Sequence, residues 1–119
     1  MTDILKELKE IVEQRRDEHE DGSYTAYLFD KGLDKILKKL GEETSETIIA
    51  AKNLETNYKD GSFPEAKEEL AGEVGDLLYH LVVMLDQLNV DVDEIADLLR
   101  SRMNKTKNLK DYSQFKENS

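Results

Sequence analysis

The sequence predicts an all-α protein, built as an antiparallel bundle of four to five helices. Apolar residues recur at intervals of three and four through most of the chain, which is the spacing of one helical face. The chain has only one Pro and six Gly, too few turn residues for an all-β sandwich or barrel. Its 119 residues fit one domain, and 38% hydrophobic residues suffice for helices that each bury one stripe.

The first half of the chain divides into three expected helices. An amphipathic pattern predicts a first helix that covers residues 4–20 and fades toward its end. Ser23 follows a break and is expected to cap a short helix over 24–30. Gly32 permits a bend before a long helix over 33–58, whose apolar pattern lasts about seven turns.

Two more helices are expected in the second half. A turn at 60–62 leads to Pro64, which suits the first position of a helix with the richest apolar stripe in the chain. Tyr79 lies away from that stripe and is expected at the surface or at an interface. Asp91 or Asp93 begins the last helix.

The expected domain covers residues 1–102, and a polar tail covers 103–119. The tail has no clear helical periodicity and no apolar stripe, so it has little surface to bury. No internal repeat or low-complexity segment interrupts the domain.

Charge and composition exclude several classes of function. The formal net charge is −10, and an acidic surface repels nucleic-acid backbones and anionic membranes, so neither is an expected partner. The longest wholly apolar stretch has five residues, which excludes a transmembrane span. The absence of Cys excludes disulfides, thiol nucleophiles and zinc–thiolate sites. The N-terminus carries acids early and resembles no targeting signal, so we expect a cytoplasmic protein.

Two acidic pairs border the apolar stripes of the two longest expected helices. At about 100° per residue, Glu43 lies on the edge of its stripe and Glu46 about 60° beyond it. Glu73 and Asp76 hold similar positions on the next helix. Like charges at a partly buried seam are destabilising unless a cation lies among them, and Mg²⁺ prefers oxygen ligands. The plainer alternative is solvated helix faces, because acids form nearly a quarter of the chain and chance alone yields several such pairs.

Several segments resemble the phosphoribosyl-ATP pyrophosphohydrolase family, and the resemblance covers about residues 4–102. It is carried by Ser23-Tyr24-Thr25, Gly32-Leu33-Asp34-Lys35-Ile36, the stretch from Lys39 to Glu46, Ala50-Ala51-Lys52-Asn53, and the stretch from Glu73 to Leu81. The resemblance implies an all-α nucleotide pyrophosphohydrolase fold and a homodimer. It also implies Mg²⁺-dependent hydrolysis of 1-(5-phosphoribosyl)-ATP between the α and β phosphates, which yields the AMP derivative and pyrophosphate in the second step of histidine biosynthesis.

The resemblance also implies roles for the acidic residues. Glu43, Glu46, Glu73 and Asp76 would bind Mg²⁺ on phosphate oxygens. Glu42, or one of the ligand carboxylates Glu43 and Glu46, would orient the attacking water as the catalytic base.

The remaining candidates are substrate-binding residues, and each has a plainer alternative. Lys35 and Lys39 suit phosphate contacts, but Lys39 also has the spacing to pair with the acid four residues later. Tyr24 and Thr25 either contact the substrate or only begin a helix. His80 falls close to the carboxylate stripe and either contacts the substrate or is a satisfied core residue.

Two other functions compete with this interpretation. One is a house-cleaning nucleotide pyrophosphatase that uses the same fold and metals on dUTP or other noncanonical triphosphates. The other is a non-catalytic helical dimerisation module whose acids are solvated. A substrate panel separates the two enzymes, and a magnesium titration separates both from the module.

Overall fold

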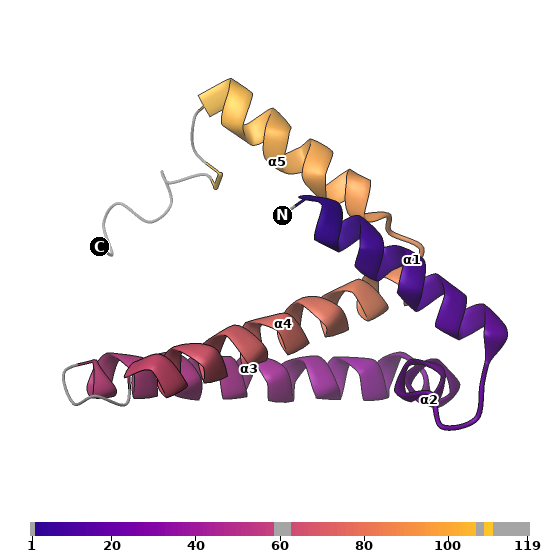
Figure 1. Cartoon of the computed structure of the whole chain (residues 1–119). Coiled ribbons are helices and arrows are strands. Elements are labelled where there is room, and N and C mark those ends of the chain that lie inside the picture. The colour runs from indigo at the N-terminus through magenta and orange to yellow at the C-terminus, as the bar shows by residue number, and fades with distance from the viewer. Residues whose placement is uncertain (1, 59–62, 107–108, 111–119) are drawn as a thin grey trace.

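The computed structural model describes residues 2–58, 63–106 and 109–110. This part of the chain folds into five α-helices, so the expected all-α class is confirmed (Figure 1). In chain order they are α1 (Thr2–Glu18), α2 (Tyr24–Lys31), α3 (Leu33–Asn57), α4 (Phe63–Gln87) and α5 (Val92–Thr106). None of these helices combines the length and the hydropathy that a membrane span requires. The turn expected at 60–62 lies outside the described residues.

The helix boundaries follow local capping chemistry. Ser23 caps α2 as expected, because its hydroxyl accepts a hydrogen bond at 3.2 Å from a backbone N–H of the first turn. Gly32 adopts a φ of 92°, in the region that favours glycine, and lets α2 turn directly into α3. Asp91 rather than Asp93 caps α5: its Oδ1 accepts from Asp93 N at 2.9 Å, and the Glu94 carboxylate accepts from Asp91 N at 2.8 Å.

The two longest helices, α3 and α4, form an antiparallel hairpin (Figure 1). α2 packs at the beginning of α3, α1 packs across the C-terminal half of α4, and α5 lies beside α1. Two ion pairs of 2.6 Å hold α1 in place, one from Arg16 to Asp86 in the last turn of α4 and one from Lys9 to Asp91 between α4 and α5. α5 continues to Thr106, so the helix runs past the domain boundary expected at residue 102.

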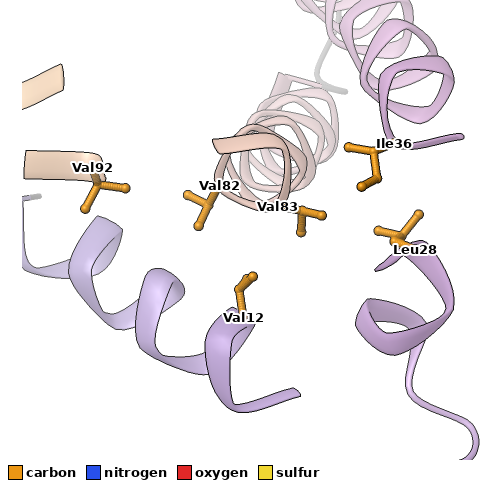
Figure 2. Packing of buried hydrophobic residues seen from close by; sticks show 6 residues of the cluster. All are labelled: Val12, Leu28, Ile36, Val82, Val83 and Val92. Atoms are coloured by element: carbon orange, nitrogen blue, oxygen red, sulfur yellow. The ribbon is translucent and has the colours of Figure 1, made fainter. Parts of the chain in front are cut away.

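The buried core is small and lies where α1, α2, α3 and α4 meet, with the start of α5 at its edge. Figure 2 shows its side chains, which are Val12, Leu28, Ile36, Val82, Val83 and Val92. Several residues of the expected apolar stripes are instead exposed, among them Ile48 at 60% and Leu98 at 50%. The radius of gyration is 17.3 Å, whereas a compact domain of this length measures about 13.5 Å. The described helices therefore spread apart and leave apolar faces uncovered by their own chain.

Candidate metal centre and its surroundings

Three acidic side chains meet at the seam between α3 and α4. Glu43 comes from α3, and Glu73 and Asp76 come from one face of α4, where a spacing of three residues places them together. One carboxylate oxygen from each lies within 4.8 Å of the others. The packing of the hairpin, rather than any single helix, thus brings together three of the four acids that the sequence pattern singled out.

The cluster contains buried carboxylate oxygens that lack hydrogen-bond partners within the described part of the chain. Glu43 Oε2 and Glu73 Oε2 are buried without a hydrogen-bond partner among the described residues. Burial raises the pKa of Glu43, and the nearby Glu46 carboxylate raises it further. Burial also raises the pKa of Glu73, with Glu46 again the next contributor. The protein by itself therefore disfavours full ionisation of this site.

Glu46 and Thr47 complete the seam from α3. Glu46 is exposed and lies outside the three-residue cluster, yet it is close enough to act on the pKa of both Glu43 and Glu73. The Thr47 hydroxyl donates to the Glu43 carbonyl at 2.8 Å and lies 3.3 Å from the Glu73 carbonyl. Thr47 thus bridges the two helices beside the cluster. The sequence analysis missed it, although its position four residues after Glu43 places it on the same face.

The donor set fits a hard divalent cation. It offers only oxygen ligands, two of them buried and unpartnered, and its negative charges face one another at the edge of the protein. A cation there would satisfy the buried oxygens and would offset the repulsion among the carboxylates. An amphipathic helix pair needs no such arrangement for its own folding.

Glu42 and the lysines of α3 lie outside the three-residue cluster. Lys39 was expected to have the spacing to pair with Glu43, but its ammonium pairs with Glu42 Oε2 at 3.1 Å. That pairing, supported by the charges of other α3 lysines, lowers the pKa of Glu42. Lys35 is half-buried one turn before Lys39. Lys35 and Lys39 therefore place positive charge on α3 one to two turns before Glu43.

Four polar residues join the beginning of α2 to α4. Tyr24 Oη lies 2.9 Å from His80 Nε2, and the Thr25 hydroxyl hydrogen-bonds the Tyr79 hydroxyl. Thr25 and His80 are only 6% and 3% exposed, whereas Tyr24 is 42% exposed. Tyr79, expected at the surface or at an interface, is half-buried in this chain, and its hydroxyl has a partner within the chain.

Comparison with known proteins gives the context of this site. The family model described as phosphoribosyl-ATP pyrophosphohydrolase matches residues 5–103. A Streptococcus sanguinis protein named phosphoribosyl-ATP pyrophosphatase is 44% identical over 108 residues, which cover 91% of this chain and 93% of that protein. A Listeria welshimeri protein of the same name is 42% identical over 114 residues, or 96% of this chain and 99% of that protein. The Bacillus subtilis histidine biosynthesis bifunctional protein HisIE is 46% identical over 99 residues, which cover 83% of this chain and 42% of that protein. This chain therefore belongs to the phosphoribosyl-ATP pyrophosphohydrolase family.

Proposed function

We propose that this protein is a hydrolase that converts phosphoribosyl-ATP to phosphoribosyl-AMP and pyrophosphate in histidine biosynthesis, and that it uses Mg²⁺. The names of its relatives support the substrate. The observation that carries the metal is the cluster of Glu43, Glu73 and Asp76, with two buried oxygens that lack partners. Because this is a step on a water-soluble ATP derivative, we place the protein in the cytoplasm, with neither nucleic acid nor membrane as a partner.

The acidic residues divide the work of the reaction. Glu43, Glu46, Glu73 and Asp76 would hold the cation, which supplies charge neutralisation on the phosphate oxygens when it is bound. The attacking water needs a carboxylate that accepts its proton. Glu42 is the weaker candidate, because its pairing with Lys39 lowers its pKa and therefore its basicity. Glu43, or Glu46 beside the cluster, is the better candidate for the base.

The polar residues around the acids contact the substrate in this proposal. Lys35 and Lys39 lie one to two turns before Glu43. Their ammonium groups can hydrogen-bond the phosphates of the departing pyrophosphate or of the remaining AMP derivative. Tyr24 is the exposed member of the group that joins α2 to α4. Thr25 and His80 are buried, so they support Tyr24 rather than meet the substrate themselves.

The enzymatic test uses purified protein, phosphoribosyl-ATP and MgCl₂, with release of pyrophosphate as the signal. Activity should disappear with EDTA and should fall at least about 10²-fold in Glu73→Gln, which keeps the shape of the side chain and removes its charge. Glu68→Gln, an exposed acid on the same helix, is the matched control and should be fully active. Calorimetric titration with MgCl₂ should show binding in the control and weakened binding in Glu73→Gln. Full activity in EDTA would refute the metal, and no pyrophosphate from wild type would refute the substrate.

The functional unit is a homodimer in this proposal, because one chain leaves an apolar groove open. The groove lies between α4 and α5 and has a volume of about 440 Å³; its lining includes Leu81, Leu85, Ile95, Leu99 and Met103. An exposed groove of this kind on a chain with a small core is typical of a subunit interface. A second copy is the occupant we favour, because a two-fold axis brings the same apolar surface of each chain together and would cover both at once.

Sedimentation of two α5 variants tests the dimer. Leu99→Glu places a charge in the groove and should yield monomers. Ser101→Glu adds the same charge on an exposed position that does not line the groove, and it should remain dimeric. A monomeric wild type, or a dimeric Leu99→Glu, would refute this interface.

A further inference from the structure

A chain of two hydrogen bonds runs from the exposed Tyr24 to the backbone beside the metal cluster. Tyr24 Oη lies 2.9 Å from His80 Nε2, and His80 Nδ1 lies 2.7 Å from the carbonyl oxygen of Asp76. The His80 ring is 3% exposed and meets the Tyr24 ring edge-on, with centroids 5.7 Å apart. Both nitrogens of a buried imidazole are therefore engaged, one by a helix carbonyl and one by a phenol.

The carbonyl oxygen fixes the direction of both hydrogen bonds. A peptide carbonyl only accepts, so His80 Nδ1 must carry the hydrogen that points to Asp76. In the neutral ring Nε2 then holds a lone pair and accepts, which requires the Tyr24 hydroxyl to donate to it. The single hydrogen of Tyr24 is thus already used inside the protein, and its oxygen has only acceptor capacity left for a ligand.

This polarity restricts which part of a substrate Tyr24 can recognise. Phosphate oxygens are acceptors, so an acceptor-only phenol cannot bind them. Tyr24 Oη is hydrogen-bonded to the His80 ring, which stands one helical turn after Asp76, so the phenol lies beside the carboxylate cluster. Where the cluster holds the phosphates, the nearest hydrogen-bond donors of phosphoribosyl-ATP are sugar hydroxyls, because each of its sugars is bonded directly to phosphate.

We propose that Tyr24 accepts a hydrogen bond from a sugar hydroxyl of the substrate, and that His80 is the positioning residue that sets this polarity. The inference rests on the proposed function. A second hydrogen bond, between Thr25 and Tyr79, holds the same turn of α2 on α4, so the phenol oxygen is placed before substrate arrives. Tyr24 therefore determines specificity, and His80 acts only through it.

Matched variants at His80 separate positioning from folding. His80→Gln carries an amide oxygen near the place of Nε2 and can still accept from Tyr24. His80→Asn carries its amide near the place of Nδ1, so it can still donate to Asp76 but offers Tyr24 no acceptor. Tyr24→Phe and His80→Asn should each raise KM for phosphoribosyl-ATP by about 2–10-fold with kcat nearly unchanged, the loss of one neutral hydrogen bond. His80→Gln should remain close to wild type, and the Tyr24→Phe/His80→Asn double variant should be no worse than Tyr24→Phe.

Analogues of phosphoribosyl-ATP that each lack one sugar hydroxyl test the ligand group. For the analogue that lacks the hydroxyl bound by Tyr24, the KM of wild type should rise to the KM that Tyr24→Phe shows with phosphoribosyl-ATP. The KM of Tyr24→Phe for that analogue should not rise further. If every analogue preserves the full difference between wild type and Tyr24→Phe, the sugar contact is refuted.

The nitrogen chemical shifts of the His80 ring give a readout independent of turnover and of any variant's folding. Wild type should show a protonated Nδ1 and an unprotonated Nε2, and Tyr24→Phe should shift the Nε2 resonance alone. A protonated Nε2, or a His80→Gln that is as impaired as His80→Asn, would overturn the inference. Active wild type with an unchanged KM in Tyr24→Phe refutes this inference alone, whereas inactive wild type refutes the proposed function.

Discussion

Glu43→Gln should stabilise the metal-free protein while it removes catalysis. Glu43 Oε2 is buried without a partner, and the pKa of this carboxyl is raised by burial and by Glu46. The amide that replaces it carries no charge and can donate to a neighbouring carboxylate. Such a hydrogen bond is worth about 1.5–3 kcal/mol when buried, and solvent at this half-open seam reduces it to about 1 kcal/mol. For 119 residues, that gain raises the unfolding midpoint by about 4 °C.

The sign of the pH dependence follows from the raised pKa. A carboxyl whose folded-state pKa exceeds its ordinary value of 4.5 destabilises the folded state progressively as pH rises above 4.5, and the loss is complete above the folded-state pKa. The advantage of Glu43→Gln should therefore be full near pH 8 and should shrink as the pH falls toward 4.5.

Differential scanning calorimetry in EDTA measures this effect, with Glu68→Gln as the control that should not change. Added MgCl₂ should raise the midpoint of wild type more than that of Glu43→Gln, because only the intact cluster binds the cation well. A clear loss of metal-free stability in Glu43→Gln, or turnover close to wild type, would contradict the crowded-carboxylate argument.

Three further predictions follow from the fold and the proposed substrate. Ile36→Ala should lower the free energy of unfolding by about 3 kcal/mol in urea titration, because Ile36 is fully buried, whereas Ile11→Ala at 47% exposure should cost far less; similar losses would contradict the described core. Deletion of 107–119 should keep kcat/KM within about 2-fold, because the family match ends at residue 103, and loss of most activity would contradict it. Phosphoribosyl-ATP should exceed ATP and dUTP in kcat/KM by at least about 10²-fold, since both lack the second ribose phosphate and its charge-assisted hydrogen bonds; comparable values would favour a house-cleaning pyrophosphatase.

The sequence predicted the helices from local periodicity. It also predicted four acids on two facing helices, of which the structure brings three together. The cap at Ser23, the bend at Gly32 and the placement of Glu43 beside Glu73 follow from spacing along one helix and from hairpin pairing. Helical angle also placed Tyr79 away from the apolar stripe, but it could not show that the Thr25 hydroxyl would meet it from another element. Contacts of that kind depend on where α2 packs, which periodicity does not specify.

Burial was harder to predict than secondary structure. An apolar stripe predicts which face of a helix needs cover, but not whether the same chain covers it. Val82 and Val83 on α4 are buried by α1, α2 and α3, whereas Ile95 and Leu98 on α5 remain exposed, since α5 lies beside α1 and leaves a groove against α4. The low apolar content of the sequence indicated that some apolar residues would stay exposed, because a small core cannot cover the apolar face of every helix.

Two features on the hairpin of α3 and α4 are unfavourable in the isolated chain, and different partners would relieve them. The seam of the hairpin gathers carboxylates that require positive charge, and its α5 side carries an apolar groove that requires another apolar surface. Binding of a cation and pairing of chains would each stabilise the folded state by mass action. Because both act on α4, the apparent stability of this protein should rise with Mg²⁺ and with protein concentration, and metal-free monomers should be its least stable form.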